Sequence, residues 1–371
     1  MTSERVELRH IPELDGLRGI AVLAVVLLHF HAPFAAARPF GPLSTLIMGG
    51  WAGVDIFFVL SGYLITSILL ATRHASNYFS AFYARRALRI FPLYVVAVAA
   101  YFWIILPFAH RHHLVTGFRA SEQLWYWTFL GNWRQGLGYN DGAGVAHFWS
   151  LAIEEQFYVL FSILVLYISG SRLVKVCAGM IAFSIVARIG LASAGMLPDL
   201  ALRLTVLHLD PIAMGALLAA SAPVRAFANR WSVLLLIVGG IGIYSGVPAG
   251  LTITAVGLGA AGVVGRACTQ PVAFLRLAIL RSLGKYSYAM YVIHGFLANA
   301  VNNLAKRHSG PAFTLTCLAG GTLVSYALAW LSWNLMEKWF LRLKRHFPYR
   351  MEVPTPSDGD PAEIDRHLIP N

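Results

Sequence analysis

Long apolar stretches, each close to the length of a membrane-spanning helix, recur along the whole chain. The hydrocarbon core of a bilayer is about 30 Å thick, so one spanning helix needs roughly 20 apolar residues. Windows of this size without charge clusters predict an all-α integral membrane protein, with about ten transmembrane helices in one bundle. The predicted segments are approximately 17–34, 46–71, 90–108, 147–168, 173–196, 201–221, 231–247, 250–265, 280–303 and 313–335.

Composition supports a chain that is solvated by lipid. Of the 371 residues, 57% are hydrophobic and 12% are charged, and the mean hydropathy is +0.63. Soluble domains are about half apolar and a quarter charged. A cleaved signal peptide is a second interpretation of the first stretch. Arg18 and His29 lie inside it and many hydrophobic segments follow, so we favour a retained helix.

The net charge of +12 has a simpler explanation than a nucleic-acid partner, and we expect none. Most of the 29 Lys and Arg residues fall in alternate loops and in both tails, as Arg73, Arg172 and Lys175 do. Positive residues are enriched in cytoplasmic loops. We therefore expect a multi-pass protein of the inner (plasma) membrane with both termini in the cytoplasm.

Short connections between the segments predict a single transmembrane domain over residues 1–345. The longer loop at 109–146 is rich in Trp and Gly, and we expect it outside, where it caps the bundle or contacts an acceptor. Residues 346–371 are polar and contain several prolines. Such a composition predicts a disordered cytoplasmic tail.

Two patterns resemble ligand sites without their usual context. Gly257-x-Gly259-x-x-Gly262 matches a dinucleotide-binding pattern, but it lies in an apolar helix with no preceding strand. Small residues at such spacing favour close helix packing in membranes. The His-rich run at 110–113 has no matching Cys or carboxylate residues. We expect neither a metal nor a permanently bound cofactor.

Titratable residues inside predicted membrane segments gather in the first four of them. Such side chains are costly in lipid and usually face a cavity or one another, so each is a candidate for a functional site. They are Arg18, His29, Asp55, Arg86, Arg89, His147, Glu154 and Glu155.

Arg18 and His29 share one face of the first helix. They are 29 − 18 = 11 residues apart, which is about three turns and about 16 Å along the axis. One helix therefore presents two depths of a single cavity, with Arg18 near the cytoplasmic headgroups. A neutral histidine at depth can act as the general base for transfer to a hydroxyl. A polar residue that bridges helices is an equally good interpretation from spacing alone.

The fourth segment places His147, Glu154 and Tyr158 on a similar side of a helix. A buried carboxylate there could orient a histidine, bind an acceptor hydroxyl, or form an interhelical salt bridge with Arg18. These alternatives stay open. Glu155, one step around the helix, is the weaker candidate.

Arg86-x-x-Arg89 places two guanidinium groups on adjacent turns at the cytoplasmic mouth of the third segment. Stop-transfer charges would explain their side of the membrane. Their spacing also suits phosphate groups such as those of coenzyme A.

Taken together, these motifs resemble the membrane acyltransferase 3 family of bacterial O-acyltransferases, over about residues 10 to 341. The matching pieces are LDGLRGIAVLAVVLLH with Arg18 and His29, GVDIFFVLSGYLI with Asp55 and Ser61, RRALRIFPLY with Arg86 and Arg89, and HFWSLAIEEQFY with His147, Glu154 and Tyr158. Weaker matches lie near Asp210, His294 and Glu337.

The resemblance implies ten helices and a cytoplasmic acyl-CoA co-substrate, with acetyl-CoA as the default. It implies that His29 is the essential histidine, that Arg18 supports it, and that Arg86 and Arg89 bind the donor. We further expect His29 to deprotonate the acceptor hydroxyl, or to take the acyl group itself, with Glu154 as a third catalytic residue that orients the imidazole or the acceptor. Asp55, Ser61, His147 and Tyr158 are expected to support the substrate or the structure. The acceptor would be a hydroxyl of a carbohydrate, lipopolysaccharide, exopolysaccharide, glycolipid or small metabolite.

Some relatives carry an additional hydrolase-like domain outside the membrane, which this sequence does not contain after the tenth segment. The resemblance therefore implies transfer directly to the acceptor or to a separate extracytoplasmic partner. The main alternative is a proton-coupled secondary transporter that uses His29 and Glu154 as a relay. The crowding of polar residues into the first four segments, without a matching pattern later, favours the enzyme. A membrane-bound sensor is disfavoured, because titratable residues at depth would then have no function.

Overall fold

The computed structural model describes residues 10–112, 120–139, 144–168, 170–196, 202–244, 249–308 and 310–351, and in these ranges the chain is helical without a named strand. Backbone groups in lipid must be satisfied within the segment, which favours helices. The first eight α-helices are α1 Pro12–His31, α2 Pro42–Met48, α3 Ala52–Ala71, α4 Tyr78–Ala100, α5 Leu106–Arg111, α6 Leu124–Trp127, α7 Gly131–Gly136 and α8 Trp149–Tyr167. The others are α9 Gly170–Ser193, α10 Leu209–Ala220, α11 Ala222–Arg230, α12 Ser232–Tyr244, α13 Ala249–Thr269, α14 Ala278–Ala305, α15 Pro311–Ser332 and α16 Lys338–Arg342.

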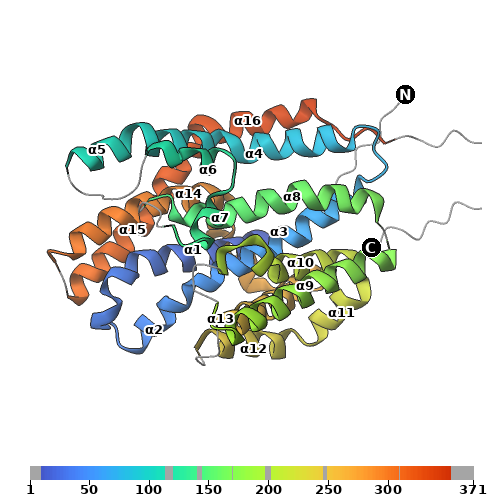
Figure 1. Cartoon of the computed structure of the whole chain (residues 1–371), viewed down its shortest axis with the longest axis horizontal. Coiled ribbons are helices and arrows are strands. Elements are labelled where there is room, and N and C mark those ends of the chain that lie inside the picture. Colours follow the sequence, from blue (N-terminus) through green and yellow to red (C-terminus); the bar gives the residue numbers. More distant parts are fainter. Residues whose placement is uncertain are drawn as a thin grey trace, which may run out of the picture.

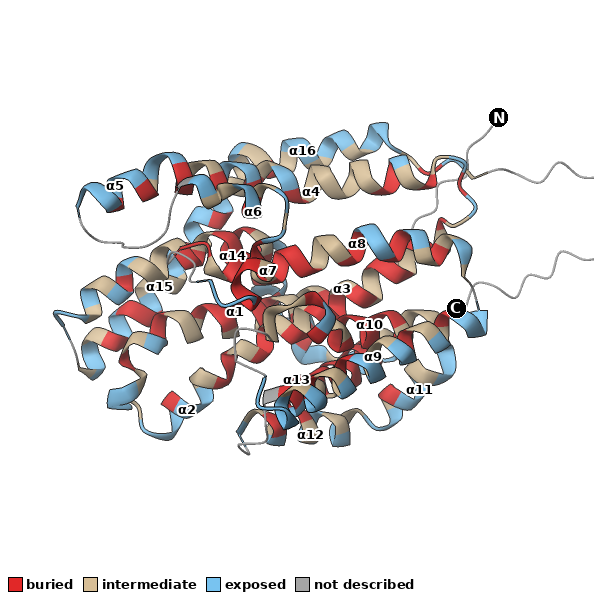
Figure 2. Cartoon of the chain, in the orientation of Figure 1, coloured by how far each residue is buried: buried red, intermediate tan, exposed pale blue. Residues whose placement is uncertain are grey.

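The helices form one bundle with α1, α3, α8, α10 and α14 at its centre (Figure 1). The helices α4, α5, α6 and α16 cover one side of this centre, and α9, α11, α12 and α13 lie on the other. Buried residues concentrate on the central helices, whereas the outer helices turn exposed residues away from them (Figure 2). The centre of the bundle is therefore the place where polar side chains can be sheltered from lipid.

The outer faces carry large apolar residues that a soluble protein would bury. Examples are Trp103 at 66% exposure, Val186 at 67% and Leu323 at 68%. Exposed apolar surface on this scale fits contact with lipid tails. The chain is a multi-pass membrane protein.

The expected fold class is confirmed, and the count of about ten is approximate. By length and composition, seven helices of the described ranges could cross a membrane, or eight if α10 and α11, bent by 112°, form one span. Each predicted segment coincides with a helix, but α12 has only 13 residues. Helix α14 has 28 residues, but it is not among the seven helices that are apolar enough to cross a membrane. The reason is that Arg281, Lys285 and several Asn residues lower its hydropathy.

Glycines allow the central helices to touch backbone to backbone. Helices α1 and α14 meet at two glycines. A Cβ at Gly19 of α1 would overlap the carbonyl oxygen of Leu280 on α14, and a Cβ at Gly284 of α14 would overlap the carbonyl oxygen of Asp15 on α1. On α3, a Cβ at Gly62 would overlap the carbonyl oxygen of Ile212 on α10. Small residues at a crossing let membrane helices approach closely. These crossings fix the positions of α1 and α3, which carry Arg18 and Ser61.

The other predictions from the sequence concern the glycine pattern of α13, the loop at 109–146 and the tail. The glycine pattern of α13 serves helix packing, as expected, because Gly259 lies against Gly239 of α12. In the 109–146 loop, α6 and α7 form short helices, while 113–119 and 140–143 lie outside the described residues, as do 352–371 of the predicted tail. The main chain at 348–350 bonds to Asn77, which holds this end of the chain against the start of α4.

Replacing Gly62 with Ala should separate α3 from α10 and destabilise the protein by about 1–3 kcal/mol, because a methyl group has no room there. The measurement is the thermal unfolding midpoint of the purified protein in detergent. Gly190→Ala on α9 is the matched control, since a Cβ there meets nothing within 4 Å. Equal stability of the two variants would contradict the importance of the crossing.

Candidate functional site

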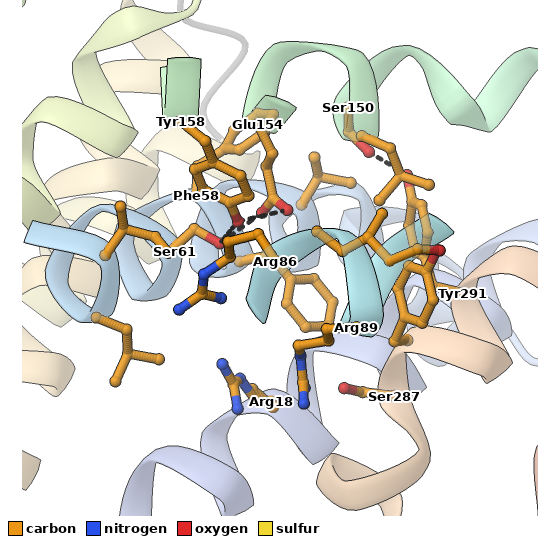
Figure 3. Close-up of a pocket in the computed structure, with 17 residues that line it drawn as sticks. Arg18, Phe58, Ser61, Arg86, Arg89, Ser150, Glu154, Tyr158, Ser287 and Tyr291 are labelled. Carbon is orange, nitrogen blue, oxygen red and sulfur yellow. Dashed lines mark hydrogen bonds between the residues drawn. The ribbon is translucent and has the colours of Figure 1, made fainter. Parts of the chain in front are cut away.

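A narrow cavity lies among α1, α3, α4, α8 and α14 (Figure 3). Its volume is about 90 Å³, which holds several water molecules. We call it the arginine cavity. The polar residues that line it are Arg18, Ser61, Arg86, Arg89, Ser150, Glu154, Tyr158, Ser287, Tyr288 and Tyr291.

Three cations converge in the arginine cavity. The guanidinium groups of Arg18, Arg86 and Arg89 point into the same space (Figure 3). Arg18 lies 3.8 Å from Asp15, and Arg86 lies over the ring of Tyr158, 5.8 Å from its centre. Within the described part of the chain, neither Arg86 nor Arg89 makes a hydrogen bond or ion pair. Cations gathered in this way repel one another, and an anionic ligand would relieve the repulsion.

A hydrogen-bonded group of side chains forms the part of the cavity wall next to Arg86 (Figure 3). Ser61 Oγ donates to Glu154 Oε1 at 2.7 Å, and Tyr158 OH donates to Oε2 at 3.2 Å. The structure thus brings Glu154 and Tyr158 together, as their spacing on the helix predicts. The salt bridge weighed between Glu154 and Arg18 does not form within 4 Å in the described residues. Glu154 is instead held by two neutral hydroxyl groups.

A second, larger cavity of about 650 Å³ contains His29. We call it the histidine cavity. The residues that give it its chemistry are His29, Trp51, Asp55, Trp149, Arg203 and His208. Flat indole rings beside hydrogen-bonding groups suit a ligand that is both ring-shaped and polar.

The hydrogen bonding of His29 fixes its tautomer. Nδ1 lies 2.8 Å from the carbonyl oxygen of Val25, which can only accept, so Nδ1 carries the proton. The neutral ring then has its lone pair on Nε2, for which the described residues supply no hydrogen-bond partner. A histidine in this state can take a proton from a ligand in the cavity.

The interpretation of Arg18 and His29 as two depths of a single cavity is wrong. Arg18 lines the arginine cavity, His29 lines the histidine cavity, and Val54 borders both. Helix spacing predicts which face a residue occupies, but it carries no information on the α3 side chains that divide the space. For the same reason His29 and Glu154, both expected at the catalytic centre, line different cavities.

Asp55 and His208 form a hydrogen-bonded pair that lines the histidine cavity. His208 was not predicted from the sequence. His208 Nε2 lies 2.7 Å from Asp55 Oδ1, and Nδ1 lies 2.8 Å from the carbonyl oxygen of Leu202. Both neighbours are acceptors, so the geometry fits a protonated imidazole paired with a carboxylate. His208 is 208 − 55 = 153 residues away, and no local spacing links it to Asp55.

A fully buried ion pair stands beside the histidine cavity. Arg188 donates from two nitrogens to the two carboxylate oxygens of Asp210, each at 2.7 Å, and both side chains have no exposed surface. Thr254 donates to the same carboxylate at 2.6 Å. In the sequence, this pair could have been suspected from Arg188, a charged residue inside an apolar segment. Its fork is satisfied by protein groups, so we interpret the pair as structural.

His147, expected on the Glu154 face, lies elsewhere. Its Nε2 donates to the carbonyl oxygen of Val292 at 3.2 Å, and its ring contacts that of His294 with centroids 4.9 Å apart. The reason is that His147 belongs to a 3-10 turn, Ala146–Phe148, ahead of α8. Helical spacing therefore does not extend back to it.

The chain is similar to one family of known proteins and to several named O-acetyltransferases. The family described as "Acyltransferase domain" matches residues 11–330. The Bacillus subtilis protein named "Putative peptidoglycan O-acetyltransferase YrhL" is 40% identical over 177 residues, and O-acetyltransferase OatA of Staphylococcus aureus is 33% identical over 172. These matches cover 44% and 43% of this chain and 25% of each relative. No solved structure matches the chain.

Removing the carboxylate of Asp210 should destabilise the protein by about 3–5 kcal/mol, because Arg188 would remain charged and unpaired in the interior. Asp210→Ala tests this through the thermal unfolding midpoint. The control is the double replacement Arg188→Met with Asp210→Leu, which removes both charges and should recover much of the loss. A double variant no more stable than the single one would argue against an ion pair.

Proposed function

Because the chain belongs to the acyltransferase family whose domain matches residues 11–330, we propose that it is a membrane O-acetyltransferase that uses acetyl-CoA and a carbohydrate hydroxyl. The observation that carries the proposal is the convergence of Arg18, Arg86 and Arg89 in one cavity, beside a second cavity that is lined by His29. The names of the relatives support acetyl as the group and a glycan such as peptidoglycan as the acceptor. The matched segment is only a quarter of each relative. We therefore take from their names only the acetyl group and the class of acceptor.

The arginine cavity is the proposed donor site. Arginine forks bind phosphate oxygens in pairs, and no carboxylate in the described ranges competes for Arg86 or Arg89. The cavity is too small for a whole coenzyme, so a phosphate or the pantetheine arm enters it while the nucleotide stays at the opening. Basic residues of α16 and the turn at Leu343–His346 pack on α4 and would attract it.

Glu154 has a donor-side role in this proposal. Its carboxylate, held by Ser61 and Tyr158, can accept hydrogen bonds from the amide groups of the pantetheine arm. This differs from orienting the His29 ring, which lies in the other cavity. In this role, Glu154, Ser61 and Tyr158 belong to the donor site and position the thioester.

The histidine cavity is the proposed acceptor site. A sugar ring can stack on Trp51 or Trp149, while the Asp55–His208 pair bonds its hydroxyl groups. His29 Nε2 then removes the proton of one hydroxyl, whose oxygen attacks the thioester carbonyl. The ester bond forms, the carbon–sulfur bond breaks, and the proton passes to the departing thiolate.

We further propose the orientation and domain limits. The distribution of Lys and Arg supports cytoplasmic ends and a cytoplasmic opening for the arginine cavity. Residues 1–345 would then form the transmembrane domain and 346–371 a cytoplasmic tail. Transfer to a separate extracytoplasmic partner is compatible with the histidine cavity opening on the opposite side.

Replacing His29 with Ala should abolish acetyl transfer while the protein stays folded in the membrane, because no other group would deprotonate the acceptor. Mass spectrometry of cell-surface glycans compares a deletion strain with strains restored by wild type, His29→Ala or the control His31→Ala. His31 is also buried but lines neither cavity. Full restoration by His29→Ala would refute the assignment, and solute uptake without an acylated product would indicate a transporter.

Replacing Arg86 and Arg89 together with Gln should weaken acetyl-CoA binding by about tenfold or more, since charge-assisted hydrogen bonds contribute roughly 1.5–3 kcal/mol each. Isothermal titration of the detergent-solubilised protein with acetyl-CoA measures the affinity. Arg281→Gln removes an exposed charge outside the cavity and serves as the control. Unchanged affinity in the double variant would place the donor elsewhere.

A further inference from the structure

A buried histidine that packs against His29 takes no part in the mechanism so far. His294 on α14 has no exposed surface. Its Nδ1 lies 2.6 Å from the carbonyl oxygen of Tyr291, so Nδ1 carries the proton and the lone pair is on Nε2. That Nε2 is buried and, within the described residues, has no hydrogen-bond partner. Buried polar atoms are rarely left unsatisfied, and an exception calls for a reason.

The neighbours of His294 are themselves histidines. Its ring meets the ring of His29 edge to face with centroids 4.9 Å apart, and it meets the ring of His147 at the same separation. The next residue, Gly295, makes this possible, because a Cβ there would overlap the His147 ring. Three imidazoles from α1, α14 and the turn before α8 are thus packed together.

The cluster reaches toward the arginine cavity through hydroxyl groups. Tyr291 OH donates to the carbonyl oxygen of His147 at 2.8 Å and lies 2.6 Å from Ser150 Oγ. Tyr291 and Ser150 line the arginine cavity, whereas His29 lines the histidine cavity. His294 therefore stands at the boundary of the proposed donor and acceptor sites.

We propose that His294 is a positioning residue that acts through His29 by sharing the proton that His29 removes from the acceptor; this inference rests on the proposed function. When the acceptor O–H bond breaks, the proton goes to His29 Nε2, and the unpartnered lone pair of His294 stabilises the resulting imidazolium. The acceptor oxygen bonds to the acyl carbon and the carbon–sulfur bond breaks. The proton then leaves the histidine pair for the thiolate, so no proton is gained or lost overall.

His294→Asn isolates this role. The amide nitrogen of Asn can replace Nδ1 as donor to the Tyr291 carbonyl, while Nε2 is removed. The purified protein in lipid vesicles is assayed with acetyl-CoA and soluble peptidoglycan fragments as the acceptor probe. We expect kcat to fall roughly 100-fold, within the range of a lost proton-transfer group, with KM for both substrates unchanged. A kcat within about threefold of wild type would overturn the inference.

A second variant separates chemistry from folding. His294→Ala leaves space for free imidazole, and added imidazole should restore part of its rate, an effect that a purely structural residue would not show. The control is His31→Ala, whose rate should not respond, because the His31 ring stacks on Phe40 instead of contacting His29. Rates are expressed per folded protein, from size-exclusion profiles and unfolding midpoints. A folded His294→Ala protein that imidazole does not accelerate would also overturn the inference.

Failure of the proposed function gives a different result. Wild-type protein would then transfer no acetyl group, and the inference would fall with it. Active wild type, inactive His29→Ala and fully active His294→Asn would instead reject the role of His294 alone. In the His29→Ala background, His294→Asn should have no further effect, because the two residues act as one unit.

Discussion

Backbone-to-backbone contact between glycines and carbonyl groups is the constraint on which the rest of this structure depends. In lipid, apolar side chains give helices little reason to prefer one another over the solvent, so close packing must supply the specificity. Gly19 and Gly284 bring α1 onto α14, and Gly62 brings α3 onto α10. Gly19 follows Arg18 directly and Gly62 follows Ser61. The residues that let helices touch therefore also decide where the polar side chains meet.

The buried charges fall into two groups that differ in how they are compensated. The guanidinium group of Arg188 donates hydrogen bonds to Asp210, Thr254 and backbone carbonyl groups, and so links neighbouring helices. Arg86 and Arg89 are partly buried and lack such partners in the described part of the chain. A protein bears the cost of uncompensated charge where a ligand completes the site. This contrast, more than burial alone, distinguishes structural arginines from candidate ligand-binding ones.

Much of this arrangement could be predicted from the sequence, because the membrane imposes strong rules on it. Helix length, side of the membrane and the cost of charge at depth pointed to Arg18, Arg86, Arg89 and Glu154. Local spacing also predicted the Glu154–Tyr158 contact. It could not reveal that His208 would meet Asp55, or that His294 would meet His29, since these contacts depend on how distant helices cross. The division into two cavities escaped prediction for the same reason.

Val54 lines both cavities, and an apolar residue at that position has a consequence for the membrane as an electrical barrier. A continuous watery passage lined by arginine and histidine would let protons and small ions leak down the gradients that the cell maintains. An apolar side chain between two polar chambers excludes a water column and imposes a dehydration cost on any ion. A neutral acetyl group bears almost none of that cost. In the proposed reaction, an acyl group would thus pass beside Val54 while ions remain excluded.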